Sequence, residues 1–220
     1  MSLNSAQKVR NSPCKTRDTQ GRLLNAAEAL FIDAGYAGMS ARAIADKAGV
    51  NIAAMGYHFG SKQGLLEAVL IRRIAPINTS RQLRLEAVRE RRAESIRDIL
   101  HAFLWPVFFN EHEAQARRLM GRVMTEPAEV VEPLLNLVFC DVIEQFLEAV
   151  TACFPKQGRA LIAQKFSFVV GALNFTVLRP SERLLGSAPP TEVSFERLLN
   201  FSVDGFLEGS SVSVNNKDLP

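Results

Sequence analysis

Residues 23–70 form the stretch that decides the fold, LLNAAEALFIDAGYAGMSARAIADKAGVNIAAMGYHFGSKQGLLEAVL. Apolar residues recur in it at the three- and four-residue spacing of amphipathic helices. The second and third of the expected helices are short and are joined by a tight turn at Gly49. Two short helices around such a turn form the pattern of a helix-turn-helix. The three expected helices cover residues 19–35, 41–48 and 52–59.

Polar residues with short side chains stand where these helices begin. Such side chains accept hydrogen bonds from the free backbone N–H groups of a first helical turn. The expected caps are Thr19, Ser40, Asn51 and, for a fourth and longer helix, Ser61. Pro76 is expected to kink or end that fourth helix, because proline lacks the backbone N–H.

The rest of the chain keeps the helical spacing and shows no alternating strand pattern, which predicts an all-α protein of about nine to ten helices. The further helices are expected near residues 81–92, 95–109, 113–125, 131–153, 156–178 and 191–208, with a loop at 180–190. The expected domains are a disordered basic tail (1–18), a helix-turn-helix domain (19–64), a larger helical effector-binding and dimerisation domain (65–208) and a flexible tail (209–220).

Positive charge is concentrated at the N-terminus. Residues 1–62 hold eight Lys and Arg against four Asp and Glu, whereas the remaining 158 residues hold 18 against 19. A basic module beside a near-neutral partner is typical of polyanion binding. Charge alone leaves open a solvated tail without a partner.

Several other classes of protein are not indicated. The longest uncharged runs are 14 residues (48–61) and 13 residues (166–178), short of the roughly 20 that span a membrane. The first 18 residues are polar and basic without an apolar stretch, which favours the cytoplasm over secretion. Cys14, Cys140 and Cys153 lack CxxC spacing, so we expect reduced thiols. The sequence contains no catalytic motif, and its three histidines lack metal-ligand spacing, so we expect no enzyme, cofactor or metal.

The stretch 23–70 resembles the N-terminal domain of the TetR family of bacterial transcriptional regulators. The matching elements, in order, are Ala26-Ala27, Leu30-Phe31, Gly35-Tyr36, Ser40, Ile44-Ala45, Ala48-Gly49-Val50, Tyr57-His58-Phe59, Ser61-Lys62 and Leu65. A fainter likeness, through VNIAA, YHFGSK and RRIAPIN, is to the fatty-acid-responsive subgroup typified by PsrA. The resemblance implies a homodimeric repressor that binds a pseudo-palindromic DNA operator and is released by a small apolar effector.

The third helix is the expected reader of the DNA major groove. Its start is apolar, with Ile52 where the family often has a basic residue and Gly56 where it often has a tyrosine, so recognition would depend on thymine methyls, Tyr57 and DNA shape. The resemblance places His58 at a phosphate; without it, a packed histidine would be the better interpretation. The expected DNA-binding residues are Ser40, Arg42, Asn51, Ile52, Ala53, Ala54, Gly56, Tyr57, His58 and Lys62.

Two helices of the larger domain carry stripes that suit a dimer interface. Small residues on one helix would let a partner approach closely, and the last helix has an apolar stripe; four such helices would form the interface. A stripe inside the monomer fits the pattern equally well. The expected interface residues are Ala163, Ser167, Gly171, Phe195, Leu198, Leu199 and Ser202.

Aromatic residues of the larger domain cluster near polar ones, and core packing is the simpler explanation of such clusters. A mostly apolar cavity with few polar groups is also what an effector site requires. An acyl ligand with its anionic head near Arg118 or Arg122 would suit it. The expected pocket residues are Phe103, Trp105, Phe108, Arg118, Arg122, Phe139, Phe168 and Asn174.

The sequence also fits an alternative function. Gly56 and the apolar third helix also fit a helical dimeric adaptor or small-molecule-binding protein without sequence-specific DNA binding. An enzyme with an unrecognised site is a third alternative.

Overall fold

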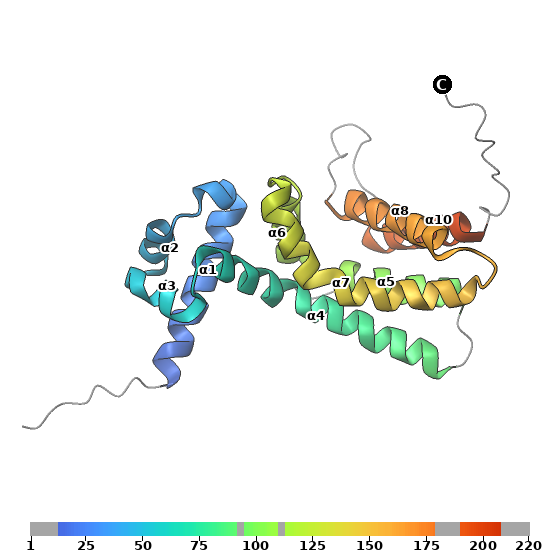
Figure 1. Cartoon of the computed structure of the whole chain (residues 1–220), viewed down its shortest axis with the longest axis horizontal. Coiled ribbons are helices and arrows are strands. Elements are labelled where there is room, and N and C mark those ends of the chain that lie inside the picture. The colour runs from blue at the N-terminus through green and yellow to red at the C-terminus, as the bar shows by residue number, and fades with distance from the viewer. Residues whose placement is uncertain (1–12, 92–94, 110–112, 179–189, 208–220) are drawn as a thin grey trace, which may run out of the picture.

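The computed structural model describes residues 13–91, 95–109, 113–178 and 190–207, and this part of the chain is all-α. Its nine helices confirm the predicted fold class (Figure 1). They are α1 (Pro13–Gly38), α2 (Ala41–Ala48), α3 (Ile52–Phe59), α4 (Lys62–Glu90), α5 (Ile96–Phe108), α6 (Glu113–Val123), α7 (Ala128–Cys153), α8 (Arg159–Leu178) and α10 (Thr191–Leu207). The expected loop at 180–190 lies outside the described residues except for its last position, and so does the expected tail at 209–220.

Several helix boundaries differ from the prediction by up to three residues, and α1 and α4 differ by more. Helix α1 begins at Pro13, so residues 13–18 of the expected disordered tail are helical, and residues 1–12 lie outside the description. The helix also continues past Gly35, which bends it with a φ of 71°. Helix α4 runs through Pro76 without ending there. Buried Ile74 and Ile77 flank the proline, and their packing compensates for the lost hydrogen bond.

The caps of the three helices that follow α1 form as expected. Ser40 Oγ accepts from the backbone N–H of Ala43 at 3.1 Å, and Asn51 Oδ1 accepts from that of Ala53 at 2.9 Å. Ser61 Oγ accepts from the backbone N–H of Gly64 at 3.0 Å. These bonds satisfy N–H groups that would otherwise have no partner and fix where α2, α3 and α4 start.

The hydrophobic residues form two main clusters. The N-terminal cluster joins α1, α2, α3 and the first half of α4, and it also takes in Leu119 and Val123 of α6 and Val131 and Leu134 of α7. The second cluster lies among the end of α4, α5, α7, α8 and α10. Helices α4, α6 and α7 therefore connect the helix-turn-helix region to the larger helical region (Figure 1).

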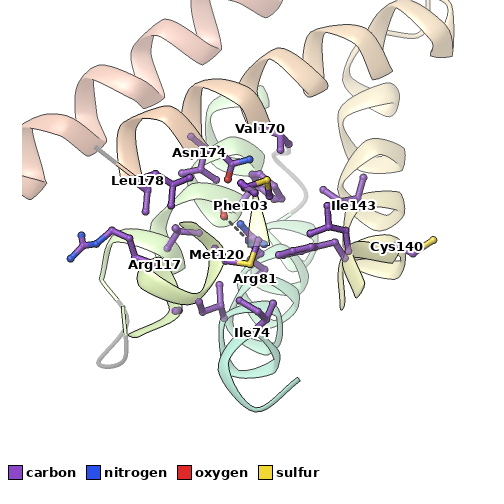
Figure 2. A pocket seen from close by; sticks show the side chains of 18 of the residues that line it. Ile74, Arg81, Phe103, Arg117, Met120, Cys140, Ile143, Val170, Asn174 and Leu178 are labelled. Atoms are coloured by element: carbon purple, nitrogen blue, oxygen red, sulfur yellow. Dashed lines mark hydrogen bonds between the residues drawn. The ribbon is translucent and has the colours of Figure 1, made fainter. Parts of the chain in front are cut away.

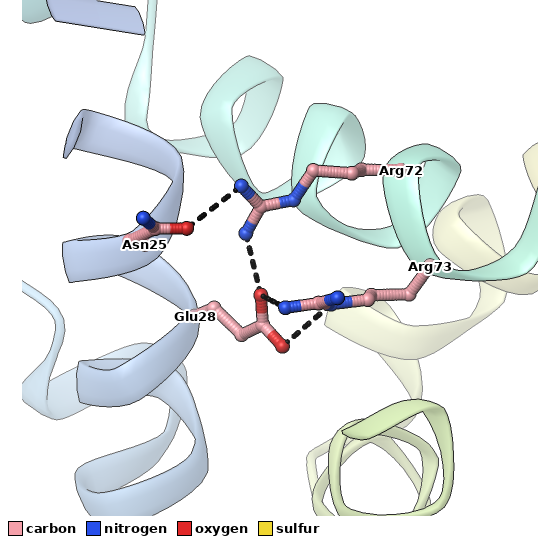
Figure 3. A network of polar contacts seen from close by, with 4 residues as sticks. All are labelled: Asn25, Glu28, Arg72 and Arg73. Carbon is pink, nitrogen blue, oxygen red and sulfur yellow. Dashed lines mark hydrogen bonds and ion pairs between the residues drawn. The ribbon is translucent and has the colours of Figure 1, made fainter. Parts of the chain in front are cut away.

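A buried carboxylate ties α1 to α4. Glu28, 6% exposed, accepts hydrogen bonds from Arg72 at 2.5 Å and from Arg73 at 2.8 and 2.9 Å, and Arg72 also donates to Asn25 (Figure 3). Two guanidinium groups around one carboxylate are strong charge-assisted pairs. They fix the angle at which α4 leaves the N-terminal domain.

Helix α8 is unusually apolar on its exposed side. Among the described residues it is the one helix with the length and composition of a membrane span, with a mean hydropathy of 1.5 and 22% of its window buried. A count of uncharged runs missed it, because Lys165 interrupts the run. One such helix is weak support for a membrane protein, and a partner protein surface accounts for it equally well.

Candidate functional site

Both backbone polar groups of Gly49, in the turn between α2 and α3, form hydrogen bonds. Gly49 adopts the left-handed conformation (φ 62°), and its N–H bonds to carbonyls at the end of α2. Arg22 of α1 donates to the carbonyl oxygen of Gly49 at 2.8 Å. Sequence reasoning missed Arg22, because its partner is 27 residues away and belongs to the backbone. The two contacts fix α3 relative to α1.

Helix α3 presents a largely apolar face to solvent. Tyr57 is 80% exposed and Ile52 is 52% exposed, while Met55 is buried. Asn51, Ala53 and Gly56 are also exposed. Ala54, expected on the same face, is half-buried against the N-terminal cluster and is therefore less available for contact.

The helices on either side of α3 in the chain carry two cationic side chains, Arg42 in α2 and Lys62 at the start of α4. Arg42 is exposed and only 4.0 Å from Asp46, a weak ion pair at the surface. Lys62 Nζ donates to the carbonyl oxygen of Tyr36 at 3.0 Å and lies 3.7 Å from the centre of its ring. An ammonium group has three donors, and the bond to Tyr36 uses one of them while it holds Lys62 in place.

His58 is half-buried between its neighbours on the same helix. Its ring meets the edge of Tyr57 at 5.0 Å and lies 6.3 Å from Phe59. The ring is therefore packed in part, against residues of its own helix, and it still reaches the surface beside the exposed Tyr57. Its expected contact with a phosphate stays a prediction.

A cavity of about 610 Å³ lies among α4, α5, α6, α7 and α8 (Figure 2). Its size lies within the range of small-molecule sites, roughly 300–1,000 Å³. Apolar side chains predominate in its wall, and the ionisable groups that line it are Arg81, Arg117, Cys140 and Glu144. Burial lowers the pKa of Arg81 to about 9, so its guanidinium is still charged at neutral pH.

The expected pocket residues divide into two groups. Phe103, Phe139 and Asn174 line the cavity. The other five expectations are corrected by the structure: Phe108 is in the core, Phe168 is 64% exposed, Arg118 is exposed, Trp105 lies under Arg84 at 3.6 Å, and Arg122 is paired with Glu126. Helical spacing identified aromatic and basic residues but could not tell which side of each helix faces the cavity.

Burial also shifts two pKa values beside Trp105. Desolvation lowers the pKa of Arg84, and desolvation together with the charge of Arg84 lowers the pKa of His101. The ring of His101 meets the edge of Phe195 at 5.2 Å. His101 therefore belongs to the packing between α5 and α10, and Arg84 belongs to the packing between α4 and α5. Neither residue lines the cavity.

Arg122 takes part in a joint between α6 and α1. It pairs with Glu126 at 2.8 Å, and both side chains lie against the buried Gly35. A Cβ at position 35 would be 1.9 Å from Arg122 Nη2. The joint therefore requires glycine both for its positive φ and for space, and it connects a helix of the cavity wall directly to the N-terminal domain.

The residues of α10 that were expected at the dimer interface lie on the side of the helix that packs inside the chain. Phe195, Leu198, Leu199 and Ser202 are buried within the chain itself. The exposed apolar residues of α10 are instead Val193, Phe201 (67%) and Leu207 (57%). The interpretation of this stripe as the interior of the monomer was the correct one.

The expected stripe on α8 remains open to a partner. Ser167 and Gly171 are exposed and Ala163 is half-buried. The same helix exposes Leu161, Phe168 (64%) and Phe175 (54%), which recur at seven-residue intervals and so lie on one side. The outer faces of α8 and α10 together are called the α8/α10 surface below, defined by Leu161, Phe168, Phe175, Val193, Phe201 and Leu207.

The fold and these surfaces define a class of protein. A three-helix unit with a capped, exposed third helix is joined to a larger helical domain that holds a cavity. This is the architecture of a two-domain helix-turn-helix protein.

Comparisons with known proteins identify the family. Residues 23–69 match the family described as "Bacterial regulatory proteins, tetR family", and residues 101–205 match "Tetracyclin repressor-like, C-terminal domain". The chain therefore belongs to the TetR family of transcriptional regulators, as the sequence resemblance indicated.

Individual relatives agree with this assignment. The chain is 34% identical over 112 residues to the HTH-type transcriptional activator FasR of Mycolicibacterium smegmatis, a match that spans 50% of this chain and 49% of that protein. The fold is similar to that of NalD, the secondary repressor of the MexAB-OprM multidrug efflux pump in Pseudomonas aeruginosa (TM-score 0.66, 21% identity, 87% of this chain and 96% of NalD). It is also similar to that of the TetR family regulator PfmR from Thermus thermophilus (TM-score 0.53, 18% identity, 84% and 97%).

Proposed function

We propose that the chain is a ligand-responsive repressor in the cytoplasm that binds a pseudo-palindromic operator as a homodimer and is released by a small apolar effector. The exposed face of α3, which follows Arg42 of α2 and precedes Lys62 of α4 in the chain, is the observation that carries the DNA-binding part of this proposal. A capped helix with a free apolar face and flanking cations suits a major groove, where base edges and thymine methyls lie between two rows of phosphates.

The α8/α10 surface supports the homodimer. A monomer that stays in solution rarely leaves several large apolar side chains exposed on one side. Two copies related by a two-fold axis would cover these side chains in a four-helix interface. The two α3 helices would then face DNA in successive major grooves, with centres about 34–36 Å apart or a multiple of that distance.

The cavity supports control by an effector. Its wall includes Ala116, Met120 and Met124 in and directly after α6, and the same helix ends at the joint with Gly35 of α1. A ligand that favours one position of α6 would change the position of the N-terminal domain. DNA affinity would then fall by the factor with which the ligand distinguishes the two states.

Selection of DNA from a random pool tests the DNA-binding proposal. The purified chain should enrich a palindromic sequence, and its affinity for that sequence should fall steeply between two salt concentrations. The variant Tyr57→Ala, altered at the most exposed large apolar side chain of α3, serves as the matched control and should lose the enrichment.

Two further observations complete this test. A reporter gene behind the enriched sequence should lose expression when the chain is produced, because we propose a repressor; higher expression would indicate an activator, as FasR is described. No enrichment by the unaltered chain would favour the alternative of a helical adaptor without sequence-specific DNA binding.

A further inference from the structure

Arg81 of α4 is a buried cation in the wall of the cavity. It is 3% exposed, and its guanidinium lies 4.2 Å from the centre of the Phe103 ring. Sequence reasoning placed the cationic group of the cavity at Arg118 or Arg122. Both lie elsewhere, whereas Arg81 lies at the centre of the lining residues (Figure 2).

The hydrogen bonds of Arg81 leave part of the guanidinium unused. Its Nε donates to the carbonyl oxygen of Phe103 at 2.9 Å, and its Nη1 donates to Asn78 Oδ1 at 3.1 Å. A guanidinium group has five N–H donors, so three remain. Both partners are neutral, and within the described residues Arg81 has no carboxylate partner.

The other charged groups of the cavity wall do not neutralise Arg81. The carboxylate of Glu144 is exposed and paired with Arg159. Arg117 has the same sign as Arg81, and its guanidinium points away from the centre of the cavity (Figure 2). A buried, charged arginine without a counter-ion is costly, and the lowered pKa of Arg81 reflects that cost.

We propose that the cavity binds an amphipathic organic monoanion whose carboxylate pairs with the guanidinium of Arg81. The carboxylate would supply the missing counter-charge, and its two oxygens match the spacing of adjacent N–H donors. The apolar body of the ligand would lie against Ile74, Ile77, Met120, Leu135, Phe139 and Val170. At about 30 Å³ for each water-sized group, the cavity holds about 20 such groups, enough for a medium-length chain or a ring system.

This inference rests on the proposed function in one respect, since it takes the cavity as the effector site. A purely structural role for Arg81 is the alternative. Pro106 lacks the N–H that would bond to the carbonyl of Ala102 in α5, and Arg81 donates to the adjacent carbonyl of Phe103. An arginine that only supports α5 would give the cavity no preference between charged and neutral ligands.

The test uses two ligands of equal length, decanoate below its critical micelle concentration and 1-decanol below its solubility limit in water. Binding to the full chain without DNA is measured by titration calorimetry and by the shift in melting temperature. We expect decanoate to bind about 10- to 100-fold more tightly than 1-decanol, because a charge-assisted hydrogen bond contributes that much. Equal affinity for the two ligands would overturn the proposal, and this comparison needs no variant.

Three variants separate pairing from structural support. In Arg81→Met the affinity for decanoate should fall at least about tenfold while that for 1-decanol stays, since the loss reflects one charge-assisted interaction. Arg81→Lys should keep part of the preference for decanoate, because the charge remains. Arg118→Met removes an exposed arginine outside the cavity and should leave both affinities unchanged. Decanoate binding to Arg81→Met as tightly as to the unaltered chain would contradict the proposal.

The outcome can be distinguished from failure of the proposed function. Ligand binding is measured without DNA, and DNA selection is carried out without ligand. Preference for decanoate that depends on Arg81, together with no enriched DNA, would leave the inference standing and the regulator proposal wrong. An enriched operator together with equal binding of the two ligands would have the opposite meaning.

Discussion

Two surfaces of this molecule expose large apolar side chains, and they differ in what surrounds them. The face of α3 exposes Ile52 and Tyr57, and the helices before and after it carry the cations Arg42 and Lys62. The α8/α10 surface exposes more and larger apolar groups, among them Phe168 and Phe201, with Ser167 and Gly171 exposed nearby. Apolar exposure thus indicates that a partner is expected, and the neighbouring side chains indicate its kind: a polyanion at the first surface and a second protein surface at the other.

The largest effect is expected from a charge at the α8/α10 surface. Phe201→Glu would place an unpaired carboxylate in a buried interface, at a cost of about 3–5 kcal/mol, and two-fold symmetry places it there twice. Light scattering should then show the mass of a monomer, and operator affinity should fall with it. Phe201→Leu is the matched control and should remain a dimer. A Phe201→Glu variant that stays dimeric would show that Phe201 lies outside the interface.

A charge on α3 should affect only one of the two surfaces. Ile52→Glu brings a carboxylate against DNA, and such like-charge contacts cost several kcal/mol. We expect operator affinity to fall at least about 100-fold in a gel-shift or fluorescence-anisotropy titration. The mass in solution should not change, and Ile52→Val should bind nearly as well as the original. A change of mass in Ile52→Glu would show that α3 also contributes to dimerisation and that the two surfaces do not have separate roles.

Loss of a single phosphate contact should lower operator affinity less than Ile52→Glu does, and it should change how that affinity depends on salt concentration. Lys62→Met removes one phosphate contact in each half-site, which should reduce the slope of log K against log salt concentration by about 1 per half-site. The variant Lys156→Met removes the same charge just beyond the far end of α7 and should leave the slope unchanged. An unaltered slope in Lys62→Met would mean that the lysine serves only its contacts with Tyr36.

The smallest expected effect concerns Gly56. A Cβ at this position meets nothing within 4 Å in the free chain, so Gly56→Ala should stabilise the protein by about 1 kcal/mol against thermal unfolding. Operator affinity should nevertheless fall, because a glycine on an exposed helix face allows close approach of another backbone. Higher stability together with unchanged affinity would show that the glycine has no role at the DNA.

The sequence predicted the N-terminal domain better than the C-terminal one, and the reason is physical. Ser40, Asn51 and Ser61 act on N–H groups two or three residues away, so their role follows from spacing alone. The turn at Gly49 is equally local. Arg22 was missed because its contact with the Gly49 carbonyl depends on how α1 packs, which spacing does not show.

In the larger domain the same reasoning identified stripes but not what covers them. Phe195 and Leu199 lie on a true apolar stripe, yet it packs inside the chain, and Phe201 on the opposite side of α10 is the exposed residue. Arg81 was not singled out, because a lone arginine in a helical pattern normally lies at the surface. Pro76 was given too much weight, because tertiary packing overrides a local break.

The uninterrupted course of α4 has a mechanical consequence. From Ile77, at the cavity, to Lys62, beside α3, the helix runs 15 residues, which is about 22 Å at 1.5 Å per residue. A tilt of about 5° around Ile77 would move Lys62 by about 2 Å, and in the proposed dimer it would move the two-fold mate by the same amount in the opposite sense. The distance between the two reading helices would then change by about 4 Å, more than the 3.4 Å or so that separates successive base pairs. A helix that broke at Pro76 would lose this amplification, and a small shift in the cavity wall would no longer carry the DNA contacts out of step with the operator.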